Sequence, residues 1–263
     1  MPAAKSAFTE RVLSAYDGRK TLRASASESF AENEAQTSLP PSLQHLRLGE
    51  QASHDVASVF IDLREFTARS FWDEPAEVAN LADAVLSGVA MIVEEMGGWV
   101  VGLRGDGLYA MFGIDPFISE QIAVLTAATA CARALSEVRE NLNPWLELRG
   151  IERVRVRAGA DFGTVAFIRS GTVHASEVNP VGFSANFASK CEKYALAWEV
   201  VVGDRFARSL GDAVEHHAES PKYYTRHGET KYYHFHDFAW RRLVPALPGF
   251  AEDIRAVLSD AGR

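Results

Sequence analysis

Short apolar runs alternate along this chain with longer segments in which apolar residues recur at helical spacing. The first run, Val56 to Ile61, is rich in β-branched and aromatic residues and predicts a buried strand that ends at Asp62. A helix is predicted after Asp73-Glu74-Pro75, because acidic residues and proline suit a first turn, and Gly97-Gly98 ends it. Its apolar positions share one face and are predicted to be core: Val78, Leu81, Val85, Val89, Ile92 and Met96.

The middle of the chain continues with two hairpins and a helix. Trp99 to Leu103 and Leu108 to Phe112 are the apolar runs of the first hairpin. A second amphipathic helix is predicted from Ser119 to Val138. Val154 to Ala160 alternates as a strand does, and Gly163 to Phe167 is predicted to be its hairpin partner.

The last third predicts one helix and two strands. The helix runs from Ser184 to Ala197, after a turn at Asn179-Pro180. Trp198 to Gly203 and the aromatic segment Lys231 to Phe235 are predicted strands. This order of elements implies an antiparallel or mixed sheet with helices on one face, which is an α+β fold.

The two ends of the chain differ from its middle in composition. Residues 1–51 are predicted to form an N-terminal helical or flexible extension with a helix from Ser6 to Tyr16; a disordered leader is the alternative. Residues 52–237 form the main domain. Residues 238–263 are expected to be a C-terminal tail with a short helix from Ala251 to Leu258.

Charge and cysteine content narrow the class of protein. The 35 acidic residues outnumber the 27 basic ones, for a net charge of −8, which argues against a nucleic acid polymer as partner. Cys131 and Cys191 lack the spacing of a metal site, and two are too few for a disulfide framework. The most apolar window, Ala84 to Val93, is shorter than a bilayer crossing. We therefore expect a cytoplasmic protein that does not insert into a membrane.

Two carboxylates stand where predicted strands end. Asp62 closes the first apolar run, and Asp106 lies in the turn of the first hairpin. Two acidic groups on neighbouring strand ends can hold a pair of divalent cations against a triphosphate. Backbone N–H groups over Arg64 to Thr67, just before a helix, are suited to binding phosphates. Either aspartate taken alone is better explained as a turn residue; the pair in this context favours the metal role.

Four motifs, in order, resemble the class III nucleotidyl cyclases, and the resemblance covers residues 52–237. The motifs are Phe60 to Thr67, Gly97 to Gly113, Arg157 to Val165, and Gly182 to Glu192. The resemblance implies a ferredoxin-like α+β catalytic domain that converts a nucleoside triphosphate to a 3′,5′-cyclic monophosphate.

The resemblance also assigns the metal and phosphate ligands. It implies two Mn²⁺ or Mg²⁺ ions per site, held by Asp62 and Asp106 with help from the carbonyl of Leu63. It implies nucleotide contacts from Phe60, Arg64, Glu65, Phe66 and Thr67. Glu65 stands where the family usually has glycine.

The fourth motif supplies the residues that act in the transition state. Asn186 and Lys190 are four apart and so share one helix face. The resemblance implies that Asn186 orients the ribose and that Lys190 replaces the family's arginine, keeping the charge but not the bidentate fork. A solvated helix lysine is the alternative for Lys190. Because the family draws the metal pair and this helix from different subunits, a homodimer with composite sites is implied.

The base-reading positions depart from the adenylate and guanylate types. Gly102 and Asn179 stand where adenylate cyclases carry Lys and Asp, and they do not match the guanylate pair. An amide both donates and accepts, which suits uracil or cytosine. Arg104 shares a strand face with Gly102 and Asp106, so it points either to the base or outward.

These departures resemble the pyrimidine cyclases of Pycsar antiphage systems, whose product activates a separate effector. The pattern is similar to the uridylate type and implies UTP as substrate, but the choice between uracil and cytosine rests on resemblance alone. The alternatives are an adenylate or guanylate cyclase with an unusual base pocket, and a catalytically silent nucleotide sensor.

Three further features of the sequence concern single positions and the histidines. Asp161 stands where the family commonly has histidine, and the family's last phosphate-binding lysine corresponds to Arg226 or His227. The stretches His216-His217 and His234 to His236 are predicted to be surface or strand histidines.

Overall fold

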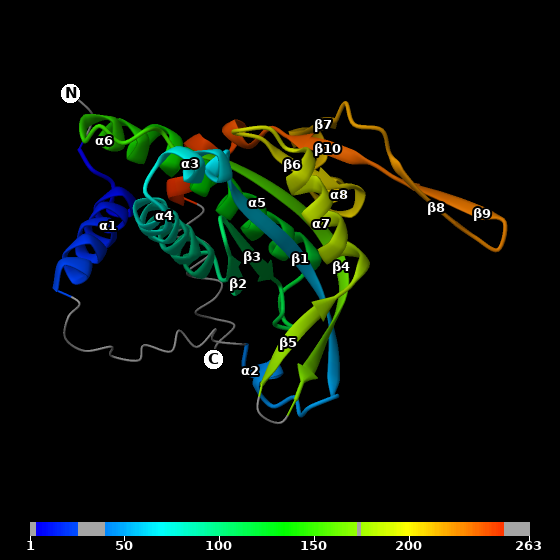
Figure 1. Cartoon of the computed structure of the whole chain (residues 1–263). Helices are drawn as coiled ribbons and strands as arrows, with labels where there is room; N and C mark the ends of the chain where they lie inside the picture. The colour runs from blue at the N-terminus through cyan, green and yellow to red at the C-terminus, as the bar shows by residue number, and fades with distance from the viewer. Residues whose placement is uncertain (1–3, 26–39, 173–174, 250–263) are drawn as a thin grey trace.

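The computed structural model describes residues 4–25, 40–172 and 175–249. One sheet of eight strands dominates the fold, in the order β2-β3-β1-β4-β6-β10-β7, with β5 paired to β4 (Figure 1). Only the β4–β6 pair of this sheet is parallel among the described residues. Its strands are β1 (Gln51–Arg64), β2 (Trp99–Arg104), β3 (Gly107–Phe112), β4 (Arg155–Gly171), β5 (Ser176–Val181), β6 (Val200–Gly203), β7 (Val214–His216) and β10 (Phe235–Phe238).

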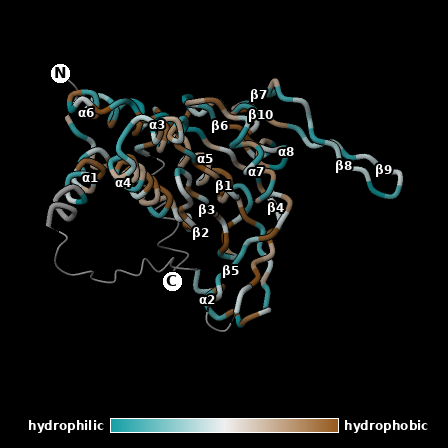
Figure 2. Tube along the Cα trace, in the orientation of Figure 1, coloured by the Kyte–Doolittle hydropathy of each residue, from teal (hydrophilic) through white to brown (hydrophobic). Residues whose placement is uncertain are grey.

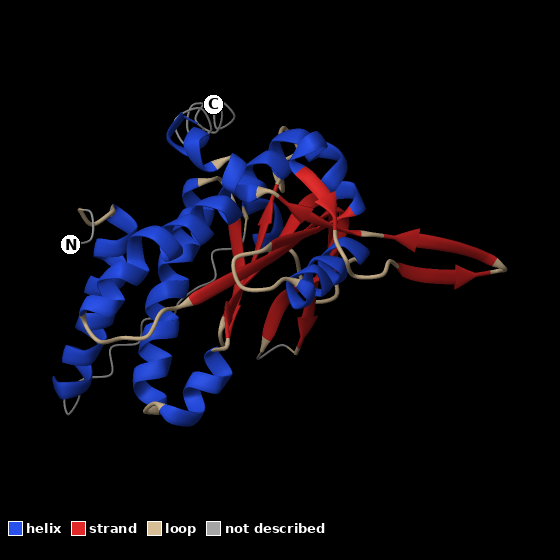
Figure 3. Ribbon diagram, turned by 90° about the horizontal axis from the view of Figure 1, so that it is seen from above, coloured by secondary structure: helices blue, strands red, loops and turns tan. Residues whose placement is uncertain are grey.

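A separate hairpin and a set of helices surround this sheet. The hairpin pairs β8 (Lys222–Arg226) with β9 (Glu229–Tyr233) and projects from one end of the molecule (Figures 1 and 3). The helices are α1 (Ala7–Ser25), α2 (Pro41–Gln44), α3 (Phe66–Trp72), α4 (Pro75–Glu95), α5 (Glu120–Ser136), α6 (Asn143–Leu148), α7 (Phe183–Tyr194) and α8 (Asp204–Leu210). A π-helical segment, Glu137–Leu142, joins α5 to α6, and 3₁₀ turns span Gly211–Ala213, Trp240–Arg242 and Val244–Ala246. The predicted α+β class with a mixed sheet is confirmed.

Helices cover both faces of the sheet, so the expectation of one covered face is wrong. Ala158 and Ala160 of β4 share a buried cluster with α4 and α5. Gly159 lies between them and points the other way, because side chains alternate along a strand. A Cβ at Gly159 would lie 2.0 Å from the backbone nitrogen of Glu192, so α7 rests directly on that opposite face. Figure 2 shows the apolar residues concentrated where the sheet meets its helices.

The predicted N-terminal helix is present and docked. It continues to Ser25, and Phe8 and Val12 are buried in the main core against α4 (Figure 1). A Cβ at Gly88 of α4 would lie 2.7 Å from a methyl group of Val12, so the glycine allows the close approach. A disordered leader is therefore wrong for these residues. The helix predicted at 251–258 lies outside the described residues, and the division at residues 51 and 238 stays a prediction.

Two predicted strand segments need correction. Gly163 to Phe167 is not a hairpin partner but the continuation of β4, which runs for 17 residues. Its neighbour β1 is 14 residues long and pairs with it throughout, from Arg64↔Arg155 to Gln51↔Ile168. The segment Lys231 to Phe235 is divided, because the N–H of His234 donates to the carboxylate of Asp204 at 2.8 Å instead of continuing a ladder.

Helix α4 is long and apolar enough to cross a bilayer, which the short window Ala84 to Val93 did not predict. Its most apolar 18-residue window is 56% buried inside the fold. Packing against α1, α5 and the sheet accounts for that composition. Both cysteines are also buried, and burial raises the pKa of the Cys131 thiol to about 12 and that of Cys191 well above its usual value.

Candidate active site

One cavity lies where β1 and the β2–β3 hairpin meet β5 and α7. Its volume is about 450 Å³, within the range of small-molecule sites. Five of the predicted site residues line it together: Phe60, Asp62, Gly102, Asn179 and Asn186. The sequence places these residues on four separate elements, so the fold alone brings them to one place.

The two predicted metal carboxylates come from paired strand ends. Asp62 is opposite Gly107 in the β1–β3 register, one residue beyond Asp106. The N–H of Leu63 donates to the carbonyl of Asp106 at 2.8 Å, and Gly105 turns the hairpin with a positive φ of 63°. The negative charge of Asp106 contributes to raising the pKa of Asp62, so the two carboxylates interact electrostatically.

A third carboxylate and an arginine complete this acidic group. Arg157 of β4 is opposite Asp62 in register and donates through Nε to its Oδ2 at 2.8 Å. Its Nη2 forms an ion pair with Oε1 of Glu192, on α7, at 2.6 Å. Burial raises the pKa of Asp62, against the opposing effect of Arg157. Burial also raises the pKa of Glu192 to about 7; Arg157 lowers it and the charge of Asp62 adds to the rise.

Sequence reasoning missed Glu192 as a site residue, although it ends the fourth motif. The signal was available, because Glu192 follows Phe187, Ala188 and Cys191 on the apolar side of the helix. A carboxylate on such a face is expected to have a charged partner.

The oxygen donors of this group suit a divalent cation. The carboxylates of Asp62 and Glu192 contact the guanidinium of Arg157, and the charge of Asp106 acts on Asp62; repulsion among these carboxylates contributes to the raised pKa values of Asp62 and Glu192. Carboxylate oxygens are the ligands that Mg²⁺ and Mn²⁺ prefer. The residues present therefore fit the predicted metal site.

A second acidic group, Glu199, His217 and Asp237, has ligand atoms within 4.8 Å of one another. The N–H of Glu219 donates to Nδ1 of His217 at 2.9 Å, which leaves the proton of the neutral imidazole on Nε2. That nitrogen faces Asp237 at 3.7 Å as a donor and offers no lone pair to a metal. We assign no cation to this group.

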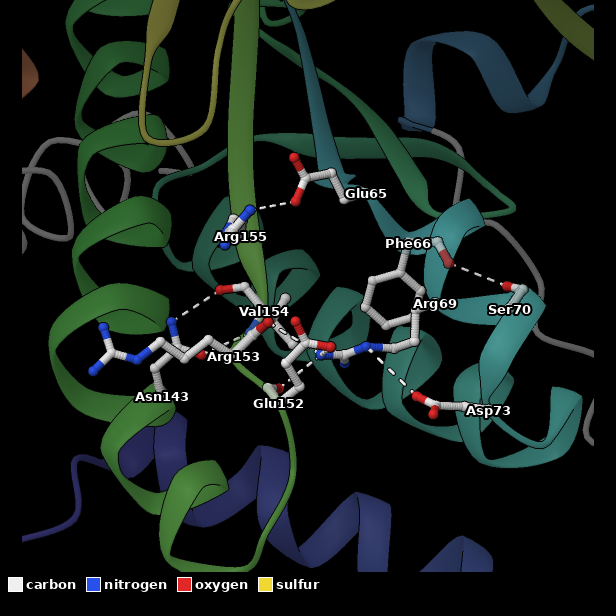
Figure 4. Close-up of polar contacts among 10 residues, drawn as sticks. All are labelled: Glu65, Phe66, Arg69, Ser70, Asp73, Asn143, Glu152, Arg153, Val154 and Arg155. Atoms are coloured by element: carbon white, nitrogen blue, oxygen red, sulfur yellow. Dashed lines mark hydrogen bonds and ion pairs between the residues drawn. The ribbon is translucent and has the colours of Figure 1, made fainter.

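The turn predicted to bind phosphates is anchored to the segment before β4 (Figure 4). Glu65 takes a left-handed conformation, φ 64°, before α3, which explains why glycine is usual at this position. Its carboxylate pairs with Arg155, and Arg69 donates to the carbonyl of Glu152 at 2.8 Å. The side chain of Phe66 is buried in the core, so any nucleotide contact there comes from its backbone.

Comparison with known structures identifies the fold of this chain. The guanylyl cyclase Cya2 superposes with a TM-score of 0.60 at 21% identity, covering 73% of this chain and 94% of that one. The adenylyl cyclase CyaB from P. aeruginosa gives 0.62 at 18% identity, covering 72% and 95%. The chain has the class III nucleotidyl cyclase fold.

Curated proteins that this chain resembles in sequence include two that are named as pyrimidine nucleotide cyclases. A "Cytidylate cyclase" from Escherichia coli is 22% identical and covers 74% of this chain and 44% of that protein. A "Uridylate cyclase" from Micromonospora echinofusca is 27% identical, covering 56% and 48%. The chain thus spans less than half of either relative, and no family model matches it.

One wall of this cavity is a stacked pair of aromatic rings. The rings of Phe60 and Tyr109 are 4.3 Å apart and nearly parallel, at 9°. The hydroxyl groups of Tyr109 and Ser58 lie 3.2 Å apart, and burial raises the pKa of Tyr109 to about 12. The tyrosine is therefore neutral at physiological pH, and the wall presents flat apolar surface to a ligand.

Several predicted site residues do not line this cavity: Leu63, Arg64 to Thr67, Asp106 and Lys190. Lys190 is on α7, one turn beyond Asn186. Arg104 ends β2, and its side chain lies outside what the structure describes. Their roles stay predictions. Of the predicted histidines, His234 and His236 both contact Asp204, at 3.2 and 2.8 Å; His236 is in β10, and His234 lies between β9 and β10.

Asp161, at the position where histidine is common, is wholly buried next to α7 and β6. Tyr233 donates its hydroxyl to this carboxylate at 3.0 Å. Burial raises the pKa of Asp161 to about 7, against backbone N–H donors that lower it. The carboxyl group is therefore partly protonated near neutral pH.

This raised pKa makes stability depend on pH. The folded value exceeds the usual 3.8, so the contribution of Asp161 is complete below pH 4 and is lost as the pH rises through about 7. We expect the free energy of unfolding to fall between pH 4 and 8, and to fall less in Asp161→Asn. Urea unfolding at a series of pH values measures both slopes, and parallel slopes would contradict this role for Asp161.

Proposed function

We propose that this domain cyclises a pyrimidine nucleoside triphosphate, UTP before CTP, to the 3′,5′-cyclic monophosphate and pyrophosphate. The observation that carries the proposal is a cavity, in a fold shared with nucleotidyl cyclases, in which the uncharged base-pocket residues Gly102 and Asn179 lie together with Asn186. The names of the two pyrimidine-acting relatives support the choice of substrate.

Each residue has a role that its chemistry suits. Asp62 and Asp106, with the carbonyl of Leu63, would hold Mn²⁺ or Mg²⁺, which supply activation of the 3′-hydroxyl and charge neutralisation on the triphosphate. The 3′-oxygen bonds to the α-phosphorus, its proton leaves, and the bond to pyrophosphate breaks. Asn186 orients the ribose, and the ammonium group of Lys190 stabilises charge on the reacting phosphate.

The predicted base pocket lacks the charged Lys–Asp pair with which adenylate cyclases bind adenine. Gly102 has no side chain within the cavity, and the amide of Asn179 carries no charge, so the two cannot form an ion pair around adenine. The amide of Asn179 can donate to O4 of uracil and accept from N3–H. A base with the wrong edge leaves buried polar groups unpaired, which discriminates strongly.

One observation favours CTP as the second candidate. Glu177 precedes Asn179 by two residues on β5 and lines the same cavity. A carboxylate only accepts hydrogen bonds, so it suits the N4 amino group of cytosine, which uracil lacks. The ratio of UTP to CTP use is therefore set by how Asn179 and Glu177 share the base.

The wider setting follows from the same resemblance. We propose a cytoplasmic homodimer in which Asp62 and Asp106 of one subunit face Asn186 and Lys190 of the other. The cyclic pyrimidine nucleotide would act as a second messenger on a separate effector in antiphage defence. Within a single chain Asn186 lines the same cavity as Asp62 and Lys190 does not, so the assignment of Asn186 and Lys190 to the partner's site rests on the resemblance.

The test is substrate ranking. The protein is incubated with UTP, CTP, ATP or GTP and Mn²⁺, and products are identified by mass spectrometry and kcat/KM. We expect kcat/KM to be highest for UTP. Asn179→Asp should lower kcat/KM for UTP, because a carboxylate cannot donate to O4. Glu177→Gln should lower kcat/KM for CTP selectively. ATP or GTP as the best substrate would replace the pyrimidine assignment with a purine cyclase, and no product with any nucleotide would favour a silent sensor.

A further inference from the structure

Arg157 lies between two carboxylates that come from different elements. Its Nε and Nη2 both lie 2.8 Å from Oδ2 of Asp62, at the end of β1, and Nη2 lies 2.6 Å from Oε1 of Glu192 on α7. Its Nη1 donates to the backbone carbonyls of Lys193, at 3.2 Å, and Ala195, at 3.4 Å. One guanidinium therefore connects β1 to the last turn of α7.

Low solvent exposure strengthens these ion pairs, and close packing of α7 on β4 restricts their geometry. The side chains of Arg157, Asp62 and Glu192 are only 13%, 19% and 11% exposed. Water screens charges poorly at such positions, so each carboxylate depends on the shared cation. The contact of Gly159 with the backbone of Glu192 leaves no room for α7 to shift toward β4.

We propose that Arg157 is a positioning residue that Asp62 and Glu192 share, and that it couples the cation site on β1 to α7. The proposal rests on the proposed function, because α7 carries Asn186 and Lys190. A cation at Asp62 repels the guanidinium and competes with it for the same carboxylate. Arg157 then turns its charge toward Glu192, so binding at one end of the network is transmitted to the helix at the other.

In the proposed dimer this coupling connects the two active sites. Asp62 of a chain serves one composite site, and Asn186 of the same chain serves the other. The network within each chain therefore makes cation binding in one site alter the helix that acts in its neighbour. Coupling of this kind is a difference in affinity, which can be measured with the metal alone.

The experiment measures Mn²⁺ binding without nucleotide, by electron paramagnetic resonance of the free ion, beside turnover with the best triphosphate. Arg157→Gln removes the competing charge, so we expect Mn²⁺ to bind several-fold more tightly. We expect turnover to fall about 10- to 100-fold, because Asp62 and α7 lose their common anchor. If Arg157 only maintained the fold, Arg157→Gln would lower Mn²⁺ affinity and turnover together.

Glu192→Gln is expected to act in the opposite direction. Asp62 is then the only carboxylate paired with Arg157, and the guanidinium competes more strongly with the cation. We therefore expect Mn²⁺ to bind several-fold more weakly. In the double variant with Arg157→Gln this weakening largely disappears, since Glu192 acts through the guanidinium. Arg169→Gln is the matched control: it is at the opposite end of the same strand and donates to the carbonyl of Leu46, so its Mn²⁺ affinity should equal that of the parent.

Weaker Mn²⁺ binding in Arg157→Gln, or additive effects in the double variant, would overturn the proposal. If Arg157→Gln does not fold, Arg157→Lys replaces it, and parent-like Mn²⁺ affinity in Glu192→Gln then overturns the proposal by itself. These metal measurements need no turnover. Absence of product from every triphosphate would thus reject the cyclase function while the opposite shifts in Mn²⁺ affinity still supported the network.

Discussion

Replacing either metal aspartate by asparagine is expected to abolish cyclisation. In Asp62→Asn or Asp106→Asn the site loses an anionic ligand but keeps its shape, so we expect turnover to fall at least about 1000-fold, which is about 4 kcal/mol of transition-state stabilisation. Product formation with Mn²⁺ is followed by chromatography. The fold should persist, because Arg157 keeps Glu192 and the carbonyls of Lys193 and Ala195 as partners.

Asp55→Asn is the control for this loss. Asp55 is on the same strand, accepts a hydrogen bond from Thr164 at 2.5 Å, and lies away from the cavity. Its activity should stay near that of the parent. Turnover close to the parent's in Asp62→Asn or Asp106→Asn, with an unchanged circular dichroism spectrum, would show that these carboxylates do not hold the catalytic ions.

Mixing two inactive chains is expected to restore activity. An Asp62→Ala chain keeps Asn186 and Lys190, and a Lys190→Ala chain keeps both aspartates, so a heterodimer contains one complete site and one doubly defective site. Random exchange makes half of the dimers mixed, so we expect about a quarter of the parent's activity per chain.

Exchange must be verified by native mass spectrometry of the mixture. Each parent alone serves as the control, and a mixture of Asp62→Ala with Asp106→Ala should stay inactive, because both changes fall in the same half of the site. Verified mixed dimers with no activity would refute the shared-site arrangement.

Much of the fold follows from local pattern. The helix α4 was predictable because Pro75 begins it, Gly97 follows it, and its apolar residues repeat on one face. The turn at Asp106 was predictable from two glycines between apolar runs. In these segments a few neighbouring residues determine the structure.

The predictions from sequence failed where the structure depends on a partner residue distant in the sequence. Gly163 has the composition of a turn, yet β1 is long enough to hold it in an uninterrupted ladder opposite Val56. Glu192 was missed because its partner, Arg157, is on a strand 35 residues earlier, and no spacing rule links them. Lys190 and Arg104 stay predictions because the partner subunit and the nucleotide would fix their positions.

The buried cysteines make the molecule convenient for site-specific labelling. Thiol reagents attack the thiolate, and burial with a raised pKa keeps Cys131 and Cys191 in the unreactive thiol form. A cysteine introduced on an exposed position of the β8–β9 hairpin, such as Thr225→Cys, would then take a spin label or fluorophore in the otherwise native chain. In the proposed homodimer one label per subunit gives one distance, so the subunit arrangement can be measured without first removing native residues.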